Sequence, residues 1–168
     1  RYSRRSHSRI SVVPGIILGM GLSLIAVMVE LSRPRDAVLR RLPQDGKFHD
    51  CHESDDGESV PGLLVYRPYA PLFFANARHV MGRIETLVDE AGPATRWLVI
   101  DAQAITDIDI TAADRLAQLQ RELAERGVVI KFADCPRPVR EQLARLQALG
   151  LLSAQDFYVS VGKAVQAF

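Results

Sequence analysis

A single long apolar run stands near the start of the chain. Ile10 to Val29 form twenty residues without a formal charge, and twenty helical residues span about 30 Å, the thickness of a bilayer core. A cleaved signal peptide is the alternative, but the run is longer than a usual signal core and continues into ELSRPR without a small-residue cleavage pattern. We therefore predict a retained transmembrane helix over residues 10–31, preceded by a polar basic segment over residues 1–9.

Small residues recur every four positions within this run, at Gly15, Gly19 and Ser23. Such a stripe lets another membrane helix approach closely, which indicates a membrane partner. Four arginines precede the run and four follow it, so the positive-inside rule assigns no orientation. Pro34 ends the helix, and a polar stretch rich in Asp, Gly and Glu follows, so we interpret residues 32–60 as a linker.

After residue 60, short apolar runs alternate with amphipathic segments. The apolar runs predict strands at Gly62–Arg67, Pro71–Ala75, Trp97–Asp101 and Val128–Ala133. The amphipathic segments predict three helices, which run from an Asn76 cap to Glu90, from an Asp109 cap to Gly127, and from Pro138 to Gly150. Residues 157–168 add a short strand and helix. This alternation predicts an α/β fold with helices packed on a mixed sheet.

Charge and cysteine content narrow the functional classes. The net charge of +1 hides a basic section over residues 1–41, with eight Arg against two acidic residues, ahead of a mildly acidic remainder. Because the arginines flank an apolar run instead of interleaving with aromatic residues, we expect no nucleic-acid partner. Two cysteines make no disulfide framework. His49, Cys51 and His52 lack a second ligand pair at structural-zinc spacing, so a polar loop is preferred to a metal site.

Three segments carry a specific resemblance to a known family. They are Val60 to Ala77, Trp97 to Leu119 and Glu125 to Cys135, and together they look like the STAS domain of SulP-type anion transporters. The run from Pro14 to Pro34 resembles the last membrane helix of that family. The resemblance covers nearly the whole chain from about Val13.

The resemblance implies a STAS-type mixed sheet over residues 61–168, placed on the cytoplasmic side of a plasma or bacterial inner membrane. It also implies a regulatory and interaction domain of a sulfate or bicarbonate transporter that cannot transport alone, is not an enzyme and needs no cofactor. The implied partner is the transporter's membrane domain, with another STAS domain or a cytosolic regulator as further possibilities.

Similar domains also act as free-standing anti-sigma factor antagonists, in which a serine at the start of a helix is phosphorylated. Here that position is Ile110, which carries no hydroxyl. Thr111 is the next hydroxyl, but Asp107 and Asp109 would repel a phosphate placed on it. The regulatory loop and helix start thus comprise Asp107, Asp109, Ile110 and Thr111, and a single-span signalling protein is one alternative function.

The same loop admits a second alternative. Asp107 to Thr111 match D-x-D-x-T, the nucleophile motif of haloacid dehalogenase-type phosphatases, which would use the two aspartates with magnesium. That motif should follow directly on an apolar strand, whereas QAIT intervenes after Asp101. Helix capping explains the same aspartates.

One further group of residues is a candidate interface. For Asn76, local hydrogen bonding at a helix start is the first interpretation and contact with the membrane domain the second. Phe73 and Phe74, next to each other on a predicted strand, should point in opposite directions, one toward the core and one toward a partner or loop.

Overall fold

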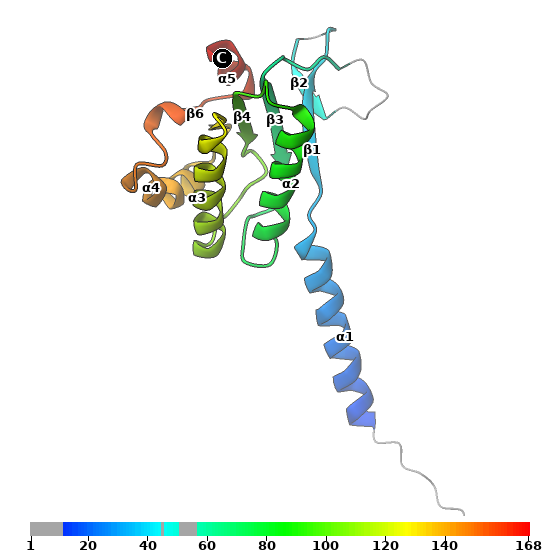
Figure 1. Cartoon of the computed structure of the whole chain (residues 1–168). Coiled ribbons are helices and arrows are strands. Elements are labelled where there is room, and N and C mark those ends of the chain that lie inside the picture. The colour runs from blue at the N-terminus through cyan, green and yellow to red at the C-terminus, as the bar shows by residue number, and fades with distance from the viewer. Residues whose placement is uncertain (1–11, 45, 51–56) are drawn as a thin grey trace, which may run out of the picture.

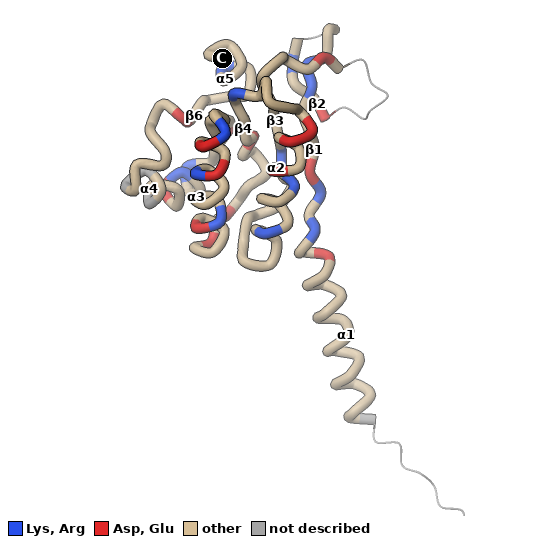
Figure 2. The backbone as a smooth tube through the Cα atoms, viewed as in Figure 1, with Lys and Arg blue, Asp and Glu red and all other residues tan. Residues whose placement is uncertain are grey.

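The computed structural model describes residues 12–44, 46–50 and 57–168, and in it one helix stands apart from a layered α/β domain (Figure 1). Helix α1 (Val12–Ser32) has no side chain buried against the described part of the chain: its segment Val13–Ser32 has a mean hydropathy of 2.0 and no buried share. Figure 2 shows no Lys or Arg along it, and its one charged residue is Glu30, in the last turn. By length and composition α1 is a candidate membrane span.

The domain is built on a six-stranded sheet in the order β2-β1-β3-β4-β5-β6. The strands are β1 (Asp36–Arg41), β2 (Phe48–Asp50), β3 (Leu63–Pro68), β4 (Trp97–Asp101), β5 (Val129–Ala133) and β6 (Phe157–Tyr158). Strands β3 to β6 are parallel, whereas β1 is antiparallel to both β2 and β3. The predicted mixed sheet is therefore confirmed.

Helices cover both faces of this sheet unequally. They are α2 (Ala77–Ala91), α3 (Ile110–Glu125), α4 (Arg137–Ala148) and α5 (Val161–Ala167), with a 3₁₀ turn at Ala154–Asp156. The larger core packs α2, α3 and α4 on one face, and the smaller core packs α5 on the other. In β4, Leu98 and Ile100 join the larger core and Val99 the smaller one. This two-sided burial is why that strand shows no polar alternation.

The predicted linker over residues 32–60 is wrong in its middle part, because strands β1 and β2 occupy it. Ala37 and Leu39 are buried in the smaller core, whereas Val38 faces the other side of the sheet, against the larger core. Period-2 alternation is therefore present in β1, but it rests on very few apolar residues.

The strand predicted at Pro71–Ala75 is also wrong. Only an isolated bridge between Leu72 and Ile108 forms there, and the chain then turns into α2. The other strands and helices predicted from the sequence are present, including the short strand and helix of residues 157–168.

The burial of Leu39 makes it possible to test in solution whether residues 36–41 form strand β1 or an unstructured linker. Leu39 is 3% exposed, so Leu39→Ala should cost about 2–5 kcal/mol through lost burial and a residual cavity. The measurement is urea unfolding of the full chain in detergent, followed by the fluorescence of Trp97, the only tryptophan. Arg41→Ala, at the exposed end of the same strand, should stay within about 0.5 kcal/mol. Equal stability of both variants would contradict the placement of β1.

Candidate functional site

Two loops lie side by side where the parallel strands β3 and β4 end. Residues 69–76 follow β3 and residues 102–109 follow β4. The Leu72 amide donates to the Asp107 carbonyl at 2.9 Å, and the Asp109 amide donates to the Leu72 carbonyl at 3.0 Å. We call these loops and the first turn of α3 the rim. Carboxyl ends of parallel strands are the usual place for a site in an open α/β sheet.

Asn76 holds the first of these loops in shape. Its side chain is fully buried, where Oδ1 accepts from the Phe73 amide at 3.0 Å and Nδ2 donates to the Pro71 carbonyl at 2.9 Å. The residue stands at the N-cap position of α2, but its side chain accepts no hydrogen bond from that helix. The expected cap is therefore replaced by hydrogen bonds that close the preceding loop, which satisfies a buried amide.

Asp109 joins the two loops to helix α3. One carboxylate oxygen accepts from the Ala112 amide at 2.7 Å, which confirms the predicted N-cap. The other oxygen accepts from the Phe74 amide at 2.8 Å. Both oxygens of Asp109 thus have backbone donors from different segments.

Asp107 is tied to α4 instead. Its Oδ1 accepts from the Gln142 side-chain amide, and the Gln142 Oε1 accepts from the Ile108 amide at 2.9 Å. The second loop is consequently anchored to the helix that follows β5.

The rim exposes two large apolar side chains among polar ones that include Gln103, Thr106 and Asp107. Phe74 is 63% exposed and Ile110 is 64% exposed, and Thr111 is exposed beside them. Phe73 is half-buried, and its ring meets the Phe74 ring edge-on at a centroid distance of 5.6 Å. The two phenylalanines therefore differ in exposure, although the predicted strand on which they were expected to alternate does not form. The structure brings the predicted loop residues together with Phe73 and Phe74, which stand far from them in sequence, whereas the third predicted interface residue, Asn76, is buried and lies outside this surface.

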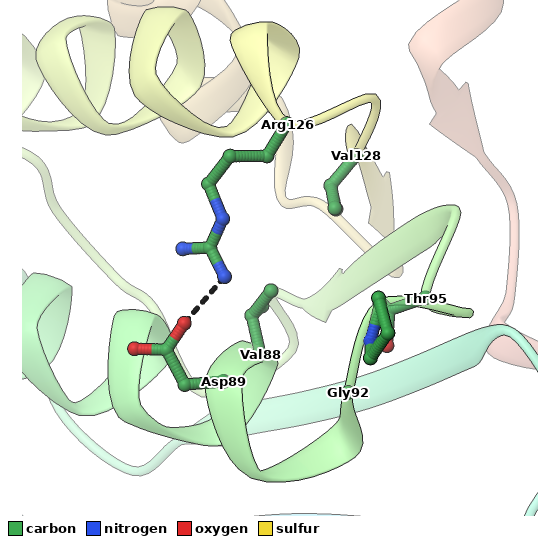
Figure 3. A pocket seen from close by; sticks show the side chains of 7 residues that line it. Val88, Asp89, Gly92, Thr95, Arg126 and Val128 are labelled. Carbon is green, nitrogen blue, oxygen red and sulfur yellow. Dashed lines mark hydrogen bonds and ion pairs between the residues drawn. The ribbon is translucent and has the colours of Figure 1, made fainter.

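A small pocket lies at the other end of the domain, where α2 and α3 terminate (Figure 3). It has a volume of about 290 Å³ and is lined by Val88, Asp89, Gly92, Pro93, Thr95, Arg126 and Val128. The Arg126 guanidinium reaches across it to an ion pair with Asp89. Because that cation already has a carboxylate partner, the pocket offers no free charge to a ligand.

Two of the three residues considered as metal ligands, Cys51 and His52, lie outside the described residues. Within the described part of the chain, no group of three His, Cys, Asp or Glu side chains is placed to hold an ion.

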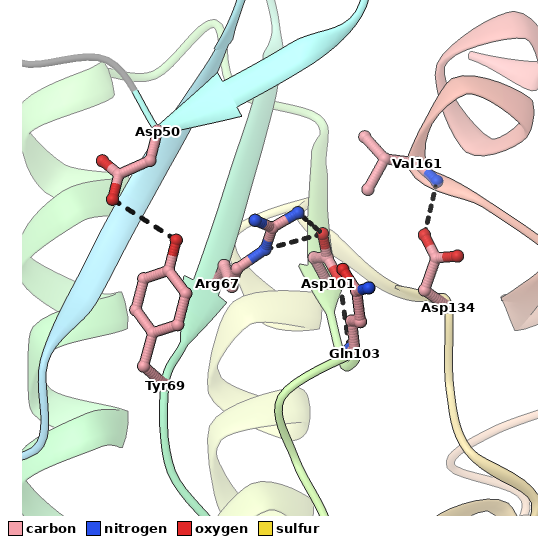
Figure 4. A network of polar contacts seen from close by, with 7 residues as sticks. All are labelled: Asp50, Arg67, Tyr69, Asp101, Gln103, Asp134 and Val161. Atoms are coloured by element: carbon pink, nitrogen blue, oxygen red, sulfur yellow. Dashed lines mark hydrogen bonds and ion pairs between the residues drawn. The ribbon is translucent and has the colours of Figure 1, made fainter.

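A buried ion pair, which the sequence analysis did not find, lies at the ends of β3 and β4 (Figure 4). Asp101 is 1% exposed, and its Oδ2 accepts from Arg67 Nε at 2.9 Å and from Nη2 at 2.5 Å. Its Oδ1 accepts from the Gln103 amide at 3.0 Å. Burial, the largest single effect, lowers the pKa of Arg67, but the hydrogen bonds and charge interactions with Asp101 and Tyr69 together raise it above its ordinary value. No local pattern pointed to this pair, because its partners are 34 positions apart.

Asp134 follows β5 at the same end and holds the start of α5. Its backbone is left-handed, with φ 52°, and its Oδ2 accepts from the Val161 amide at 3.1 Å. Burial raises the pKa of this carboxyl, the Val161 amide lowers it, and the charge of Asp101 raises it again, with a net shift upward.

Two substitutions at Asp134 separate its hydrogen bond from its charge. Asp134→Ala should cost about 1–3 kcal/mol, because alanine disfavours the left-handed backbone and accepts no hydrogen bond. Asp134→Asn keeps an acceptor, so it should be at least as stable as the wild type at neutral pH.

The pH dependence follows from the raised pKa of Asp134. The wild type loses stability as pH rises through the folded-state pKa, so the advantage of the Asn variant should vanish below the unfolded-state pKa. Urea unfolding from neutral to acidic pH measures this. An Asn variant as unstable as the Ala variant would refute the role given to the hydrogen bond.

Comparison with known proteins shows which family this domain resembles. A STAS-domain family model matches residues 56–164. A probable sulfate transporter of Mycobacterium tuberculosis is 34% identical over 159 residues, covering 95% of this chain and 28% of the relative. Sulfate transporter 1.3 of Arabidopsis thaliana is 25% identical over 166 residues, covering 94% and 25%. The chain thus spans little more than a quarter of these relatives' length.

Solved structures share the fold. The murine Solute Carrier 26 family member A9 anion transporter superposes with a TM-score of 0.81 at 17% identity, covering 94% of this chain and 26% of that one. The STAS domain of a Vibrio cholerae SulP transporter gives 0.53 at 22% identity, covering 67% and 85%. A putative anti-sigma factor antagonist of Thermotoga maritima gives 0.55 at 14% identity, covering 66% and 90%. By its family match, this chain belongs to the STAS domain family, and the relatives it matches are sulfate transporters.

Proposed function

We propose that the chain is the carboxy-terminal part of a SulP-type anion transporter, in which α1 is the last membrane helix and the domain regulates the carrier from the cytoplasm. The observation that best supports this proposal is that one sequence match includes both α1 and the domain. The match to the mycobacterial relative extends over 95% of the chain, and so includes most of α1 as well as the domain. Transport of sulfate, bicarbonate or a similar anion would need further membrane helices, so this part alone regulates and binds but neither transports nor catalyses.

The rim is the surface we assign to the membrane domain. The loop that contains Phe74 and the first turn of α3 face the end of the domain from which α1 departs (Figure 1). Exposed aromatic and branched apolar side chains such as Phe74 and Ile110 commonly anchor protein interfaces. Their backbones are held by Asp109, so little ordering cost accompanies binding. Another STAS domain or a cytosolic regulator could dock on the same pair of side chains.

The phosphatase alternative gains no support from the geometry. Strand β4 ends at Asp101, so Asp107 does not follow directly on a strand. Both carboxylate oxygens of Asp109 accept backbone hydrogen bonds. A nucleophile and an acid/base need free oxygens near a metal, whereas Asp109 serves as a helix cap.

The signalling alternative requires a phosphate at the start of α3. Ile110 supplies no hydroxyl. A phosphate on Thr111 would need free backbone amides at the helix start, but the Ala112 amide already donates to Asp109. We therefore expect no phosphorylation switch at this helix.

The reading frame around this chain tests the transporter proposal first. It should encode further apolar segments, each about twenty residues long, upstream of Arg1. Their absence would refute transport and leave a single-span binding protein.

With those segments present, the rim can be tested in the whole protein. Phe74→Ser combined with Ile110→Ser should lower sulfate uptake into proteoliposomes by about tenfold, because loss of a buried anchor costs on the order of 1–2 kcal/mol. Leu149→Ser is the matched control, since Leu149 is 69% exposed and lies in the turn that follows α4. Unchanged uptake in the double variant, with normal unfolding, would contradict docking through the rim.

A further inference from the structure

We propose that the side of the domain formed by the α1–β1 junction and the start of α2 binds anionic lipid headgroups, through Arg33, Arg35 and Arg78. This inference rests on the proposed membrane location of α1, but not on transport. It concerns a different surface from the apolar pair Phe74 and Ile110.

The connection between α1 and the sheet holds this side close to the bilayer. Only residues 33–35 separate the end of α1 from the start of β1. The Arg35 carbonyl accepts from the Tyr69 amide at 2.9 Å, and Asp36 pairs with Pro68 in the antiparallel ladder. The end of α1 is therefore fastened to β3 by backbone hydrogen bonds, and the domain cannot drift far from the membrane surface.

Helix α2 begins at the same level. In Figure 1 the loop after β3 and the first turn of α2 lie beside the upper end of α1. Arg78 is the second residue of α2. A bilayer that encloses α1 would thus place its headgroups next to this turn.

The basic side chains on this side are available. Arg33, Arg35 and Arg78 are exposed, and in the described ranges none of the three has a carboxylate partner. Figure 2 shows basic positions at the α1–β1 junction and along the first turns of α2. Three exposed arginines therefore stand on the elements that lie closest to the end of α1.

Nearby acidic groups reduce this charge but do not cancel it. Asp36 is neutralised by its ion pair with Arg83 at 3.3 Å. Asp109 keeps its negative charge, because its partners are the uncharged amides of Phe74 and Ala112. Glu30, in the last turn of α1, is another charged carboxylate at the junction. The three arginines therefore outnumber these two carboxylates.

Lipid phosphate fits this surface chemically. Guanidinium groups bind phosphate oxygens through paired, charge-assisted hydrogen bonds. Anionic leaflets attract basic segments beside a membrane span with about 1 kcal/mol per Arg. A small anion in solution would gain little binding free energy from three arginines on separate elements, whereas a layer of lipid headgroups can contact all three at once.

Hydrogen exchange of the full chain in lipid nanodiscs tests the proposal. Discs of phosphatidylcholine alone are compared with discs that also contain phosphatidylglycerol. Amides of residues 77–80 should exchange more slowly in the anionic discs, by about fivefold for each arginine engaged, the equivalent of about 1 kcal/mol. Salt at 1 M, where the Debye length is about 3 Å, should remove the difference.

Matched variants identify the side chains responsible. Arg33→Gln, Arg35→Gln and Arg78→Gln combined should abolish the difference between the two kinds of disc. Arg121→Gln, an exposed arginine in the middle of α3, should leave it intact. Trp97 fluorescence on urea unfolding confirms that each variant folds.

Several outcomes would overturn the inference. Equal exchange in both kinds of disc shows that lipid charge is not recognised. Protection produced by glycerol phosphate added to phosphatidylcholine discs shows a site for free anions instead. Failure of α1 to insert into either disc counts against the membrane helix of the proposed function, and is recognised separately by extraction with alkaline carbonate.

Discussion

The pairing of β1 with β3 is the constraint on which the rest of the structure depends. It places a strand directly after α1, so that an apolar helix and a six-stranded sheet are joined through only residues 33–35. A flexible linker would let the domain sample many orientations at little cost. Here the hydrogen bond from the Tyr69 amide and the β1–β3 ladder restrict the orientation of the domain relative to α1. A displacement of α1 would therefore be transmitted to the sheet and then to the loop that follows β3.

The rim is the part of the domain that this connection positions. Its loops are held by side chains whose partners are backbone groups, namely Asn76 for the first loop and Asp109 for the contact between loops. Fully satisfied polar groups make the backbone rigid. The rim can consequently present exposed apolar side chains without losing its shape, which suits a docking surface better than a catalytic one, since its aspartates are already engaged.

Most of the fold could be predicted from the sequence, and the errors have physical reasons. Strands β3 and β4 begin with four consecutive apolar residues, and β5 is apolar except for Lys131. Helices α2 and α3 have clear helical periodicity, so the local pattern sufficed for these elements. Strand β1 was missed because DAVLRR contains three charged residues, and its burial comes from a partner, β3, distant in sequence. The strand predicted at Pro71–Ala75 failed because the hydrogen bonds of Asn76 favour a turn. Tertiary contacts decided both cases.

The candidate site was predictable in its members but not in its assembly. The cap formed by Asp109 follows from local spacing, whereas its second bond, to the Phe74 amide 35 positions away, requires the fold. The cap bond between Asp109 and the Ala112 amide also bears on function. In a phosphorylation switch, the helix start must keep amides free for the phosphate, but here a carboxylate takes the Ala112 amide and Ile110 covers the surface beside it. An apolar residue held rigidly at such a position gains free energy only when a partner covers it, so the chemistry of this helix start favours docking over switching.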